Sequence, residues 1–399
     1  MKQTVKIAIF SGVIPSTTFI EHVITGVGKQ HEVLLFGVKK RSVRYSSKQI
    51  RIHETPSSHY LNLVVSAYRL MLLGVKSPKS VLLLFKEIQK YPKIYNKWIW
   101  FTKFLPIVLY RPDILHLQWA RDMEFYWFLK ERFGIKIVLS LLGSHINYSP
   151  ILIPKMADIY RKTFPQVDAF HAVSQAISWE AQKYYAPAQK IKVIHSPIKE
   201  KTFDFYRPPT KHGNRPLELV SVGRHHWVKG YIYALLALAY LRDHLGIVCH
   251  YTIIAQGEVP ESLLFMRYQL GLETLVRFQS GLPQETLFVK IQEYDALLLP
   301  SLNEGIANVV LEAMALGVPV ISTNCGGMAE VVHPCETGWL VPVREPEAMA
   351  NAVMDVINTP EQALQLIAQN AHDFVKAQFS AKERIAEFLK LYHEVLIGE

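Results

Sequence analysis

Residues 303–322 read NEGIANVVLEAMALGVPVIS, and the apolar run YDALLLPSL (residues 294–302) comes directly before them. This order predicts a buried strand over 295–302, a turn at 304–307 and a helix that starts near Asn308. An acidic residue at the start of a helix often does no more than favour the backbone dipole. Glu304 and Glu312 are therefore the first residues for which a structural and a binding role have to be weighed.

The same pattern of a short apolar run followed by a helical stretch recurs along the whole chain. The predicted strands are KIAIF, EVLLFGV, ILHLQWA, IKIVLSLLG, AFHAVS and KVIHSPI in the first half, and LELVSVG, YTIIAQG, LVRFQS, ALLLPSL, PVISTN and GWLVP in the second. Apolar strands that alternate with helices are typical of parallel sheets covered on both faces. We expect an α/β protein with two Rossmann-like, doubly wound domains that face a ligand cleft.

The domain boundary falls in SPIKEKTFDFYRPPTKHGNRP (residues 196–216), where Pro, Gly and charged residues are concentrated. The sequence predicts a first domain over 1–200 and a second over 201–378. The last segment, 379–399, contains the helical stretch AKERIAEFLKLYHEVL, which no strand follows. We expect this helix to pack back on the first domain.

Composition limits the classes of protein that fit. The chain has 399 residues, half of them hydrophobic, which is enough for two cores. Its three cysteines form no C-x-x-C pair, which indicates a reducing compartment and argues against a disulfide framework or a zinc site. The first apolar run, KIAIF, is too short for a signal peptide, and no stretch of about 18 uncharged apolar residues predicts a membrane span.

Charge is distributed unevenly along the chain. Residues 1–200 hold 29 Lys and Arg against 12 Asp and Glu, whereas the remainder holds 15 against 22. Within the basic half, residues 39–111 carry 15 basic residues and two acidic ones, with Trp98, Trp100, Phe101 and Phe104 among them. Such a stretch could bind nucleic acid or an anionic membrane, or could be an ordinary solvated surface. Its apolar character and the lack of a recognised nucleic-acid motif favour the membrane.

SVGRHHWVKG (residues 221–230) places Arg224 and Lys229 in a loop after a predicted strand. Two cations at the carboxyl end of a strand can hold a diphosphate, although cations on ordinary loops are common. Gly305 would allow a tight turn or a positive φ, and the free N–H groups of residues 306–310 could then bind an anion. A carboxylate beside phosphate would be repelled, so we expect Glu304 to contact sugar hydroxyls and Glu312 to contact a ribose.

Residues 220–343 resemble the donor domain of retaining glycosyltransferases of family 4, which belong to the group 1 glycosyl transferases and have the GT-B architecture. The resemblance rests on VGR-x4-KG, on the Glu-x7-Glu spacing in NEGIANVVLEAMALGVPVI, and on GGMAEVV followed by ETGWLVP. It implies that Arg224 and Lys229 hold the nucleotide diphosphate, that Glu304 contacts the transferred sugar, and that Glu312 binds the ribose. The residues predicted to bind the nucleotide sugar are Gly12, Gly223, Arg224, Lys229, Gly305, Ile306, Ala307, Asn308, Val309 and Glu312.

The first half, which the resemblance implies is the acceptor-binding domain, matches the family more loosely. Thr17 stands in IPSTTFIEHV where one subgroup often has Glu, and in LLGSHI Leu142 and His145 replace the His and Asp of a His-Gly-x-Asp pattern. His145 is grouped with Glu304, Arg224 and Lys229 as a predicted catalytic residue. For His145, and for a second candidate, His116, a structural role is an equally good interpretation.

The resemblance implies a hexosyltransferase that uses a UDP- or GDP-linked sugar and retains the anomeric configuration. Only one carboxylate, Glu304, is placed at the reacting carbon, which favours same-face attack over a two-carboxylate scheme. The chain contains no Asp-x-Asp, so we expect no metal and no other cofactor.

The acceptor is expected to be a growing cell-surface glycan or a lipid-linked one. We expect a cytoplasmic protein, peripheral on the inner face of the membrane, that binds no nucleic acid. Two other readings stay open: a GT-B nucleotide-sugar epimerase or hydrolase, and a membrane-surface binding protein whose catalytic domain is degenerate.

Overall fold

Two units, each with its own sheet and core, make up the chain in the computed structural model, which describes residues 5–211, 213 and 215–398. The first unit contains residues 1–173, 177–194 and 382–399, and the second contains 174–176 and 195–381. The chain therefore passes into the second unit at 194/195, whereas the sequence placed this boundary at 200/201. It returns to the first unit at 381/382.

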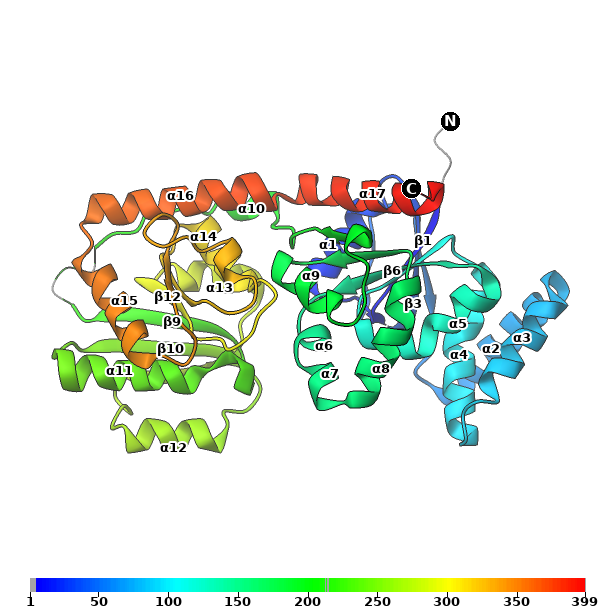
Figure 1. Cartoon of the computed structure of the whole chain (residues 1–399), viewed down its shortest axis with the longest axis horizontal. Coiled ribbons are helices and arrows are strands. Elements are labelled where there is room, and N and C mark those ends of the chain that lie inside the picture. The colour runs from blue at the N-terminus through cyan, green and yellow to red at the C-terminus, as the bar shows by residue number, and fades with distance from the viewer. Residues whose placement is uncertain (1–4, 212, 214, 399) are drawn as a thin grey trace. The chain divides into compact units, whose positions relative to one another are not determined.

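The sheet of the first unit has eight strands among the described residues, in the order β2-β3-β1-β5-β6-β7-β8, with β4 paired to β3. Strands β1, β3 and β6 of this sheet are labelled in Figure 1. Every strand pair is parallel, as the continuous apolar runs predict. The strands are β1 (Lys6–Phe10), β2 (Gly12–Ile14), β3 (Glu32–Lys39), β4 (Ile50–Glu54), β5 (Ile114–Leu117), β6 (Lys136–Leu141), β7 (Ala169–Ala172) and β8 (Ile191–Val193). Sequence analysis missed β2 and β4, the first because it has three residues and the second because IRIHE alternates polar and apolar residues.

Helices cover both faces of this sheet. Alternate residues of β1 point to opposite faces and therefore belong to different hydrophobic clusters. Ala8 and Phe10 belong to one hydrophobic cluster, and Ile7 and Ile9 to another. The helices are α1 (Thr18–Val27), α2 (His59–Lys76), α3 (Pro78–Ile88), α4 (Ile94–Tyr110), α5 (Met123–Phe133), α6 (Ser144–Asn147), α7 (Ser149–Leu152), α8 (Pro154–Thr163), α9 (Gln175–Gln182) and α17 (Ala381–Ile397).

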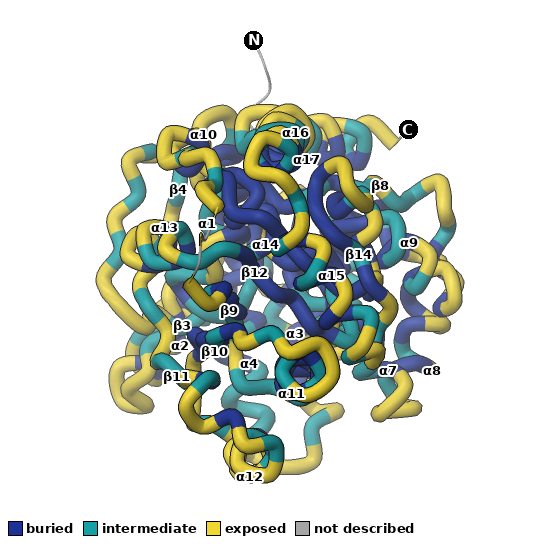
Figure 2. The backbone as a smooth tube through the Cα atoms, turned by 90° about the vertical axis from the view of Figure 1, so that its left-hand side faces the viewer, coloured by how far each residue is buried: buried dark blue, intermediate teal, exposed yellow. Residues whose placement is uncertain are grey.

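The second unit repeats the design with six parallel strands, in the order β11-β10-β9-β12-β13-β14. They are β9 (Leu217–Arg224), β10 (Cys249–Gln256), β11 (Val276–Ser280), β12 (Ala296–Leu299), β13 (Val320–Thr323) and β14 (Trp339–Val341), and all six were predicted from sequence. The helices are α10 (Glu200–Phe203), α11 (Tyr231–Leu245), α12 (Glu261–Gln269), α13 (Gln284–Ile291), α14 (Asn308–Leu316), α15 (Pro346–Asn358) and α16 (Glu361–Phe379). Figure 2 shows β9, β12 and β14 buried, while much of the surrounding loop backbone is exposed.

In each sheet the strand order reverses once, and this reversal places the sites. Chain connections run in opposite directions from β1 and β5 in the first sheet, and from β9 and β12 in the second. At such a point the loops after the two strands diverge and leave room for a ligand. Ligand sites are therefore expected at the carboxyl ends of β1 and β5 and of β9 and β12.

The basic stretch over residues 39–111 contains α2, α3 and α4, which pack on one another (Figure 1). The sequence prediction that its aromatic residues form a membrane surface is wrong for Phe101 and Phe104, which are buried in the core. Trp98 and Trp100 are partly buried against the same core. No helix in the described part of the chain is both long and apolar enough to cross a bilayer.

Candidate active site

The loop that follows β9 supplies two of the predicted cations. Arg224 is the last residue of β9, and it is exposed; within the described residues its side chain makes no hydrogen bond or ion pair. Lys229 follows in a short 3₁₀ turn (Trp227–Lys229) that leads into α11. A Cβ atom on Gly223 would lie 2.7 Å from Tyr231 Oη and 3.2 Å from Lys229 Cε. A side chain at 223 would therefore displace Lys229, which gives this glycine a role in the site.

Glu304, in the loop after β12, is paired with Lys229. Lys229 Nζ donates to Glu304 Oε1 at 2.7 Å, and Ser301 Oγ donates to the same oxygen at 2.8 Å. Both ionised side chains are only 16% exposed, so each is largely withdrawn from water and depends on the other for neutralisation. The structure thus brings together two residues that lie 75 positions apart in the sequence.

A glycine pair in the loop after β13 fixes the backbone of this site. Gly326 has a φ of 56°, and a Cβ atom there would lie only 1.8 Å from the carbonyl oxygen of Glu304. Gly327 N–H donates to the carbonyl of Gly305 at 2.9 Å. For Gly305 a tight turn or a positive φ was expected; it is not among the glycines with positive φ, and it lies in a bend of the loop. The close approach comes instead from the neighbouring loop.

Helix α14 begins at Asn308, as predicted, but its N-terminus is less open than predicted. Ala307 N–H lies 3.4 Å from Met328 Sδ, and Val310 N–H donates to the carbonyl of Ala307 at 2.9 Å. The expectation that all five N–H groups of residues 306–310 are free is therefore wrong for these two. Sulfur is a weak acceptor, so the N–H of Ala307 could exchange it for a phosphate oxygen. Ile306 and Ala307 are buried, while Asn308 is exposed and Val309 half-buried.

Glu312 lies one turn into α14, where Gln284 Nε2 donates to its Oε1 at 2.7 Å. Burial raises the pKa of Glu312 to about 7, against the opposing effects of this hydrogen bond and of Lys199. The carboxyl is thus held half-neutral near neutral pH. Either form can accept hydrogen bonds from hydroxyl groups.

Sequence analysis missed Tyr231, the first residue of α11. Its hydroxyl is buried and has no hydrogen-bond partner in the described structure. Burial and the nearby Glu304 raise the pKa of Tyr231 well above its ordinary value. A buried hydroxyl without a partner is costly unless a ligand satisfies it, so Tyr231 belongs to the site. Its position directly after Lys229-Gly230 was the available signal.

The other predicted site residues lie in the first unit. Gly12, in β2, has a φ of 80° and lines a cavity at the carboxyl ends of β1 and β5. His145, in α6, has its ring centroid 5.5 Å from that of Trp119, and its Nδ1 is buried without a partner. Burial and then Arg121 lower the pKa of His145 to about 4, so it is neutral at pH 7.

His116 is a structural residue. It is fully buried on β5, with Nδ1 2.7 Å from Tyr392 Oη and Nε2 2.8 Å from Ser140 Oγ. Burial lowers its pKa well below the ordinary value, so the ring stays neutral. Of the two readings of His116 the structural one is correct.

Comparisons with known proteins agree with the arrangement of the two units. The family model described as glycosyl transferases group 1 matches residues 202–373, and that of glycosyltransferase family 4 matches 21–201. The chain belongs to the group 1 glycosyltransferases of the GT-B class.

Two curated relatives of this glycosyltransferase are named for the biosynthesis of colanic acid and of amylovoran. WcaL of Escherichia coli, named for colanic acid biosynthesis, is 29% identical over 55% of this chain and 55% of its own. AmsK of Erwinia amylovora, named as an amylovoran biosynthesis glycosyltransferase, is 29% identical over 62% of each chain. The matched part thus spans less than two thirds of these relatives' length.

Solved structures show the same fold. A sucrose-phosphate synthase from Thermosynechococcus elongatus superposes with a TM-score of 0.75 at 17% identity, over 99% of this chain and 100% of that chain. HepE from Anabaena, solved in complex with UDP-glucose, gives a TM-score of 0.66 at 17% identity, over 97% of this chain and 99% of that one.

Proposed function

We propose that the protein transfers a hexose from a nucleoside-diphosphate sugar to a glycan acceptor, with retention of anomeric configuration. The observation that carries the proposal is the Lys229–Glu304 pair, which lies with Arg224 at the carboxyl ends of β9 and β12. HepE, whose fold is the same, was solved with UDP-glucose, and the curated relatives are named for polysaccharide synthesis. These likenesses favour a UDP-linked donor and a polysaccharide acceptor, while a lipid-linked acceptor rests on the membrane proposal below.

Each site residue has a chemical task in this proposal. Arg224 and Lys229 bind the diphosphate and stabilise the negative charge that grows on it as it leaves. Without a donor, Glu304 neutralises Lys229, which would otherwise be a buried cation without a partner. When phosphate takes up Lys229, the Glu304 carboxylate becomes free to accept hydroxyls of the sugar. Glu312 accepts the ribose hydroxyls.

The transfer step balances without a further reactant. The bond between the anomeric carbon and the diphosphate oxygen breaks, and the acceptor hydroxyl oxygen forms a new bond to that carbon on the same face. The acceptor proton passes to the departing phosphate oxygen. The charged groups held in place before reaction supply the stabilisation.

Metal independence is part of the proposal. Its basis is the sequence, which has no Asp-x-Asp, and the use of Arg224 and Lys229 in place of a divalent cation. Among the described residues, no group of three or more His, Cys, Asp or Glu side chains could hold a metal ion. Activity should survive EDTA, and loss that magnesium or manganese restores would contradict this part.

We also propose that α2 docks the protein on an anionic membrane, on its inner, cytoplasmic face. Asn62, Ser66 and Arg69 of this helix are buried, and Arg69 Nη2 donates to the carbonyl of Glu54 at 3.0 Å. Its outward face is largely apolar and includes the exposed residues Tyr60, Leu61, Leu63, Val64, Tyr68, Met71 and Val75, with the exposed His59 and Lys76 at the two ends of the helix. Exposed apolar patches of this kind mark interaction surfaces.

The charges around α2 favour a lipid surface over a protein partner. Exposed lysines lie at the end of α2, on α3 and in the turn after α3: Lys76, Lys79, Lys86, Lys90 and Lys93. The one acidic residue between 55 and 112, Glu87, is buried, and Lys90 Nζ donates to its Oε1 at 2.8 Å. An apolar face followed by exposed lysines, in a stretch over 55–112 whose one acid is buried, matches the chemistry of an anionic leaflet.

Donor binding and turnover test the central proposal. Thermal stabilisation by UDP, GDP and their sugars would identify the donor, since a ligand at 100 times its Kd adds about 2.7 kcal/mol. Arg224→Ala should fold normally, because Arg224 is exposed. Glu304→Gln can still accept from Lys229 and Ser301 but leaves Lys229 without a counter-charge, so it should melt lower than the wild type, and circular dichroism checks that it is folded at the assay temperature. Each substitution should lower the rate of turnover, measured as release of nucleotide from the donor, by roughly a hundred- to a thousand-fold. Turnover at the wild-type rate in either variant would overturn the assignment.

A further inference from the structure

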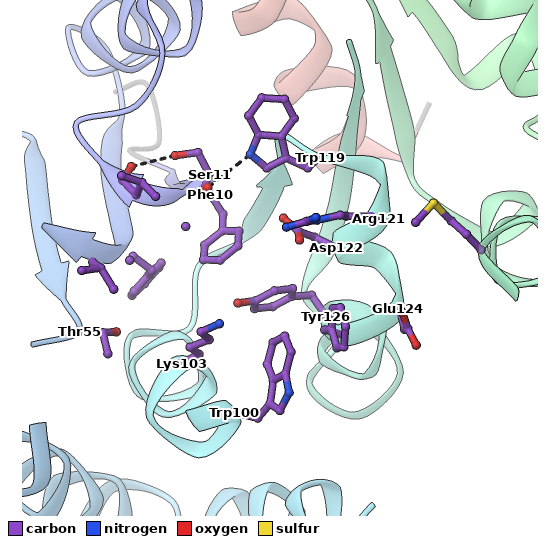
Figure 3. A pocket seen from close by; sticks show the side chains of 17 residues that line it. Phe10, Ser11, Thr55, Trp100, Lys103, Trp119, Arg121, Asp122, Glu124 and Tyr126 are labelled. Carbon is purple, nitrogen blue, oxygen red and sulfur yellow. Dashed lines mark hydrogen bonds between the residues drawn. The ribbon is translucent and has the colours of Figure 1, made fainter. Parts of the chain in front are cut away.

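The first unit has a cavity that none of the donor residues of the second unit lines. Its volume is about 570 Å³, which is within the usual range for small-molecule sites. It lies where the strand order reverses, between the loop after β1 and the loop after β5, and the carboxyl end of β3 and residues of α4 and α5 complete it (Figure 3).

Aromatic rings form much of the cavity wall. Trp119 Nε1 donates to the carbonyl of Ser11 at 3.3 Å, which fixes its indole between the two loops. Phe10 packs on Tyr126 with ring centroids 4.6 Å apart. Aromatic faces pack well against the C–H face of a pyranose ring, and they keep water away from polar groups beside them. The wall therefore suits a sugar.

Lys103 is a cation held at this wall by a ring. Its Nζ lies 4.6 Å above the centroid of Trp100, and Trp100 is in turn stacked on Phe125 at 4.1 Å. The cation–π contact positions the ammonium without neutralising it. Burial lowers the pKa of Lys103, which shows that the ammonium is partly withdrawn from water.

Arg121 and Asp122 follow Trp119 in the short turn after β5 and line the same cavity. In the described structure, the side chains of Lys103, Arg121 and Asp122 make no hydrogen bond or ion pair. Glu124, the other acidic residue of the lining, is already paired with Lys155 at 2.6 Å. The lining thus holds two cations and two carboxylates, and of these one carboxylate is already paired while both cations are uncommitted.

Asp122 differs from an ordinary surface carboxylate. Burial raises its pKa to about 6, although Arg121 and Lys103 act to lower it. A carboxyl group withdrawn from water and left without a donor is suited to accept hydroxyl groups of a ligand. Figure 3 shows Lys103, Tyr126 and Asp122 directed toward the same space.

We propose that this cavity binds the acceptor and that the acceptor is an acidic saccharide, a sugar that carries a carboxylate or a phosphate. Lys103 and Arg121 hold the anionic group, Asp122 accepts ring hydroxyls, and Trp119 packs on the apolar face of the ring. The proposal rests on the proposed function, because it names the class of acceptor for that transfer.

Sugars that differ in charge test whether the cavity prefers an anionic ligand. Methyl β-D-glucuronide and methyl β-D-glucoside differ only in one carboxylate, and glucose 6-phosphate supplies the phosphate alternative. Ligand-observed NMR titration of the full-length protein should show tighter binding of an acidic probe than of the glucoside, by roughly tenfold or more, as for a hydrogen bond to a charged group. Which acidic probe binds tighter identifies the anionic group. Equal binding of all three probes, or no binding of either acidic one, would overturn the proposal.

Variants test the residues. Lys103→Met should remove most of the preference for binding the acidic probes. Asp122→Asn should weaken the binding of the acidic and of the neutral probes alike. Lys97→Met is the matched control, because Lys97 lies on the same helix, bonds Gln89 at 2.8 Å and does not line the cavity. Retention of the full preference in Lys103→Met would refute the role of Lys103. Should that variant fail to fold, Arg121→Gln at an exposed position provides the same readout.

Binding of UDP to the same preparations separates this proposal from the proposed function. If UDP binds and no acidic sugar does, the acceptor class is wrong while the donor site stands. If acidic sugars bind in the cavity and no nucleotide binds, the transfer itself is wrong. Arg224→Ala should weaken the binding of UDP and leave the binding of the acidic probes unaffected.

Discussion

Single residues of the donor site owe their state to neighbours that lie far away in the sequence. Glu304 accepts from Lys229 and Ser301, and its carbonyl is in close contact with Gly326. Glu312 would be an ordinary helix-surface carboxylate without the desolvation that surrounds it. The chemistry of both residues therefore has measurable consequences.

Replacing Glu312 by Gln should change how stability depends on pH. The pKa of Glu312 is about 7 in the folded protein and 4.5 for an ordinary Glu, so the folded state binds more protons between these values. The stability contributed by the neutral carboxyl is fully present below pH 4.5 and is lost as the pH rises toward 7. The wild-type Tm should therefore fall relative to that of Glu312→Gln between pH 5 and pH 8. Parallel curves would show that Glu312 is not desolvated.

Replacing Gly326 by Ala should damage the site through one atom. The new Cβ would overlap the carbonyl oxygen of Glu304, so this loop and the Glu304 backbone would have to separate. Gly246→Ala is a control of the same backbone strain, since Gly246 has a φ of 67° and nothing lies within 4 Å of its Cβ position. We expect Gly326→Ala to lose most nucleotide binding and to melt lower than the control. Equal behaviour of the two variants would show that the contact has no importance.

For single residues, the sequence predicts which ones are candidates for the site better than it predicts their hydrogen bonds, their neutralisation and their backbone conformation. The motif spacing predicted Arg224, Lys229, Glu304 and Glu312 as site residues, and the structure places Lys229 against Glu304 at the ends of two parallel strands. It could not show that Lys229 and Glu304 neutralise each other, that Gly326 and not Gly305 adopts the positive φ, or that Tyr231 has an unsatisfied hydroxyl. Those facts depend on packing between loops, which local patterns do not encode.

At the scale of elements, apolar periodicity predicted the six strands of the second sheet and misassigned the basic stretch of the first unit. A buried parallel strand is apolar throughout and stands out in the sequence. The residues over 59–110 form three helices, and many apolar residues of α2 face outward, whereas Leu70, Leu72 and Leu73 pack on the core. Hydrophobicity alone cannot distinguish an apolar face that packs on the core from one that faces outward, because the two faces differ only in what covers them.

Charge introduced on the outward face of α2 should abolish membrane binding. Leu61→Glu combined with Met71→Glu places two carboxylates on a face that is now largely apolar, without touching the buried Asn62, Ser66 and Arg69. We expect sedimentation with anionic liposomes at low salt for the wild type and its loss in the double variant. Each basic residue near the surface contributes ~1 kcal/mol, so high salt should weaken the wild type as well.

Leu366→Glu is the control for this experiment, because Leu366 is 61% exposed on α16 of the other unit. It should sediment like the wild type. Absence of wild-type binding to anionic liposomes at low salt would refute the membrane proposal and leave a second protein or an unlinked glycan as the partner.

At the scale of the whole molecule, the first unit is built from segments that are distant in the chain. Residues 382–399 return to it, and Tyr392 of α17 reaches His116 in the centre of the sheet. Phe388, fully buried, packs on His171 with ring centroids 4.7 Å apart and on Phe19 at 6.4 Å. Helix α17 is thus part of the core of the first unit.

Phe388→Ala should therefore destabilise the first unit strongly. Removing a buried phenylalanine costs about 3–5 kcal/mol through lost burial and the cavity left behind. Leu366→Ala, at an exposed position on α16, should stay within about 0.5 kcal/mol of the wild type. Chemical denaturation followed by circular dichroism measures both. If the cavity of the first unit holds the acceptor, Phe388→Ala should also lose its binding of methyl β-D-glucuronide on heating. This loss should come at a lower temperature than the loss of UDP binding. Wild-type stability in this variant would mean that α17 does not complete the core.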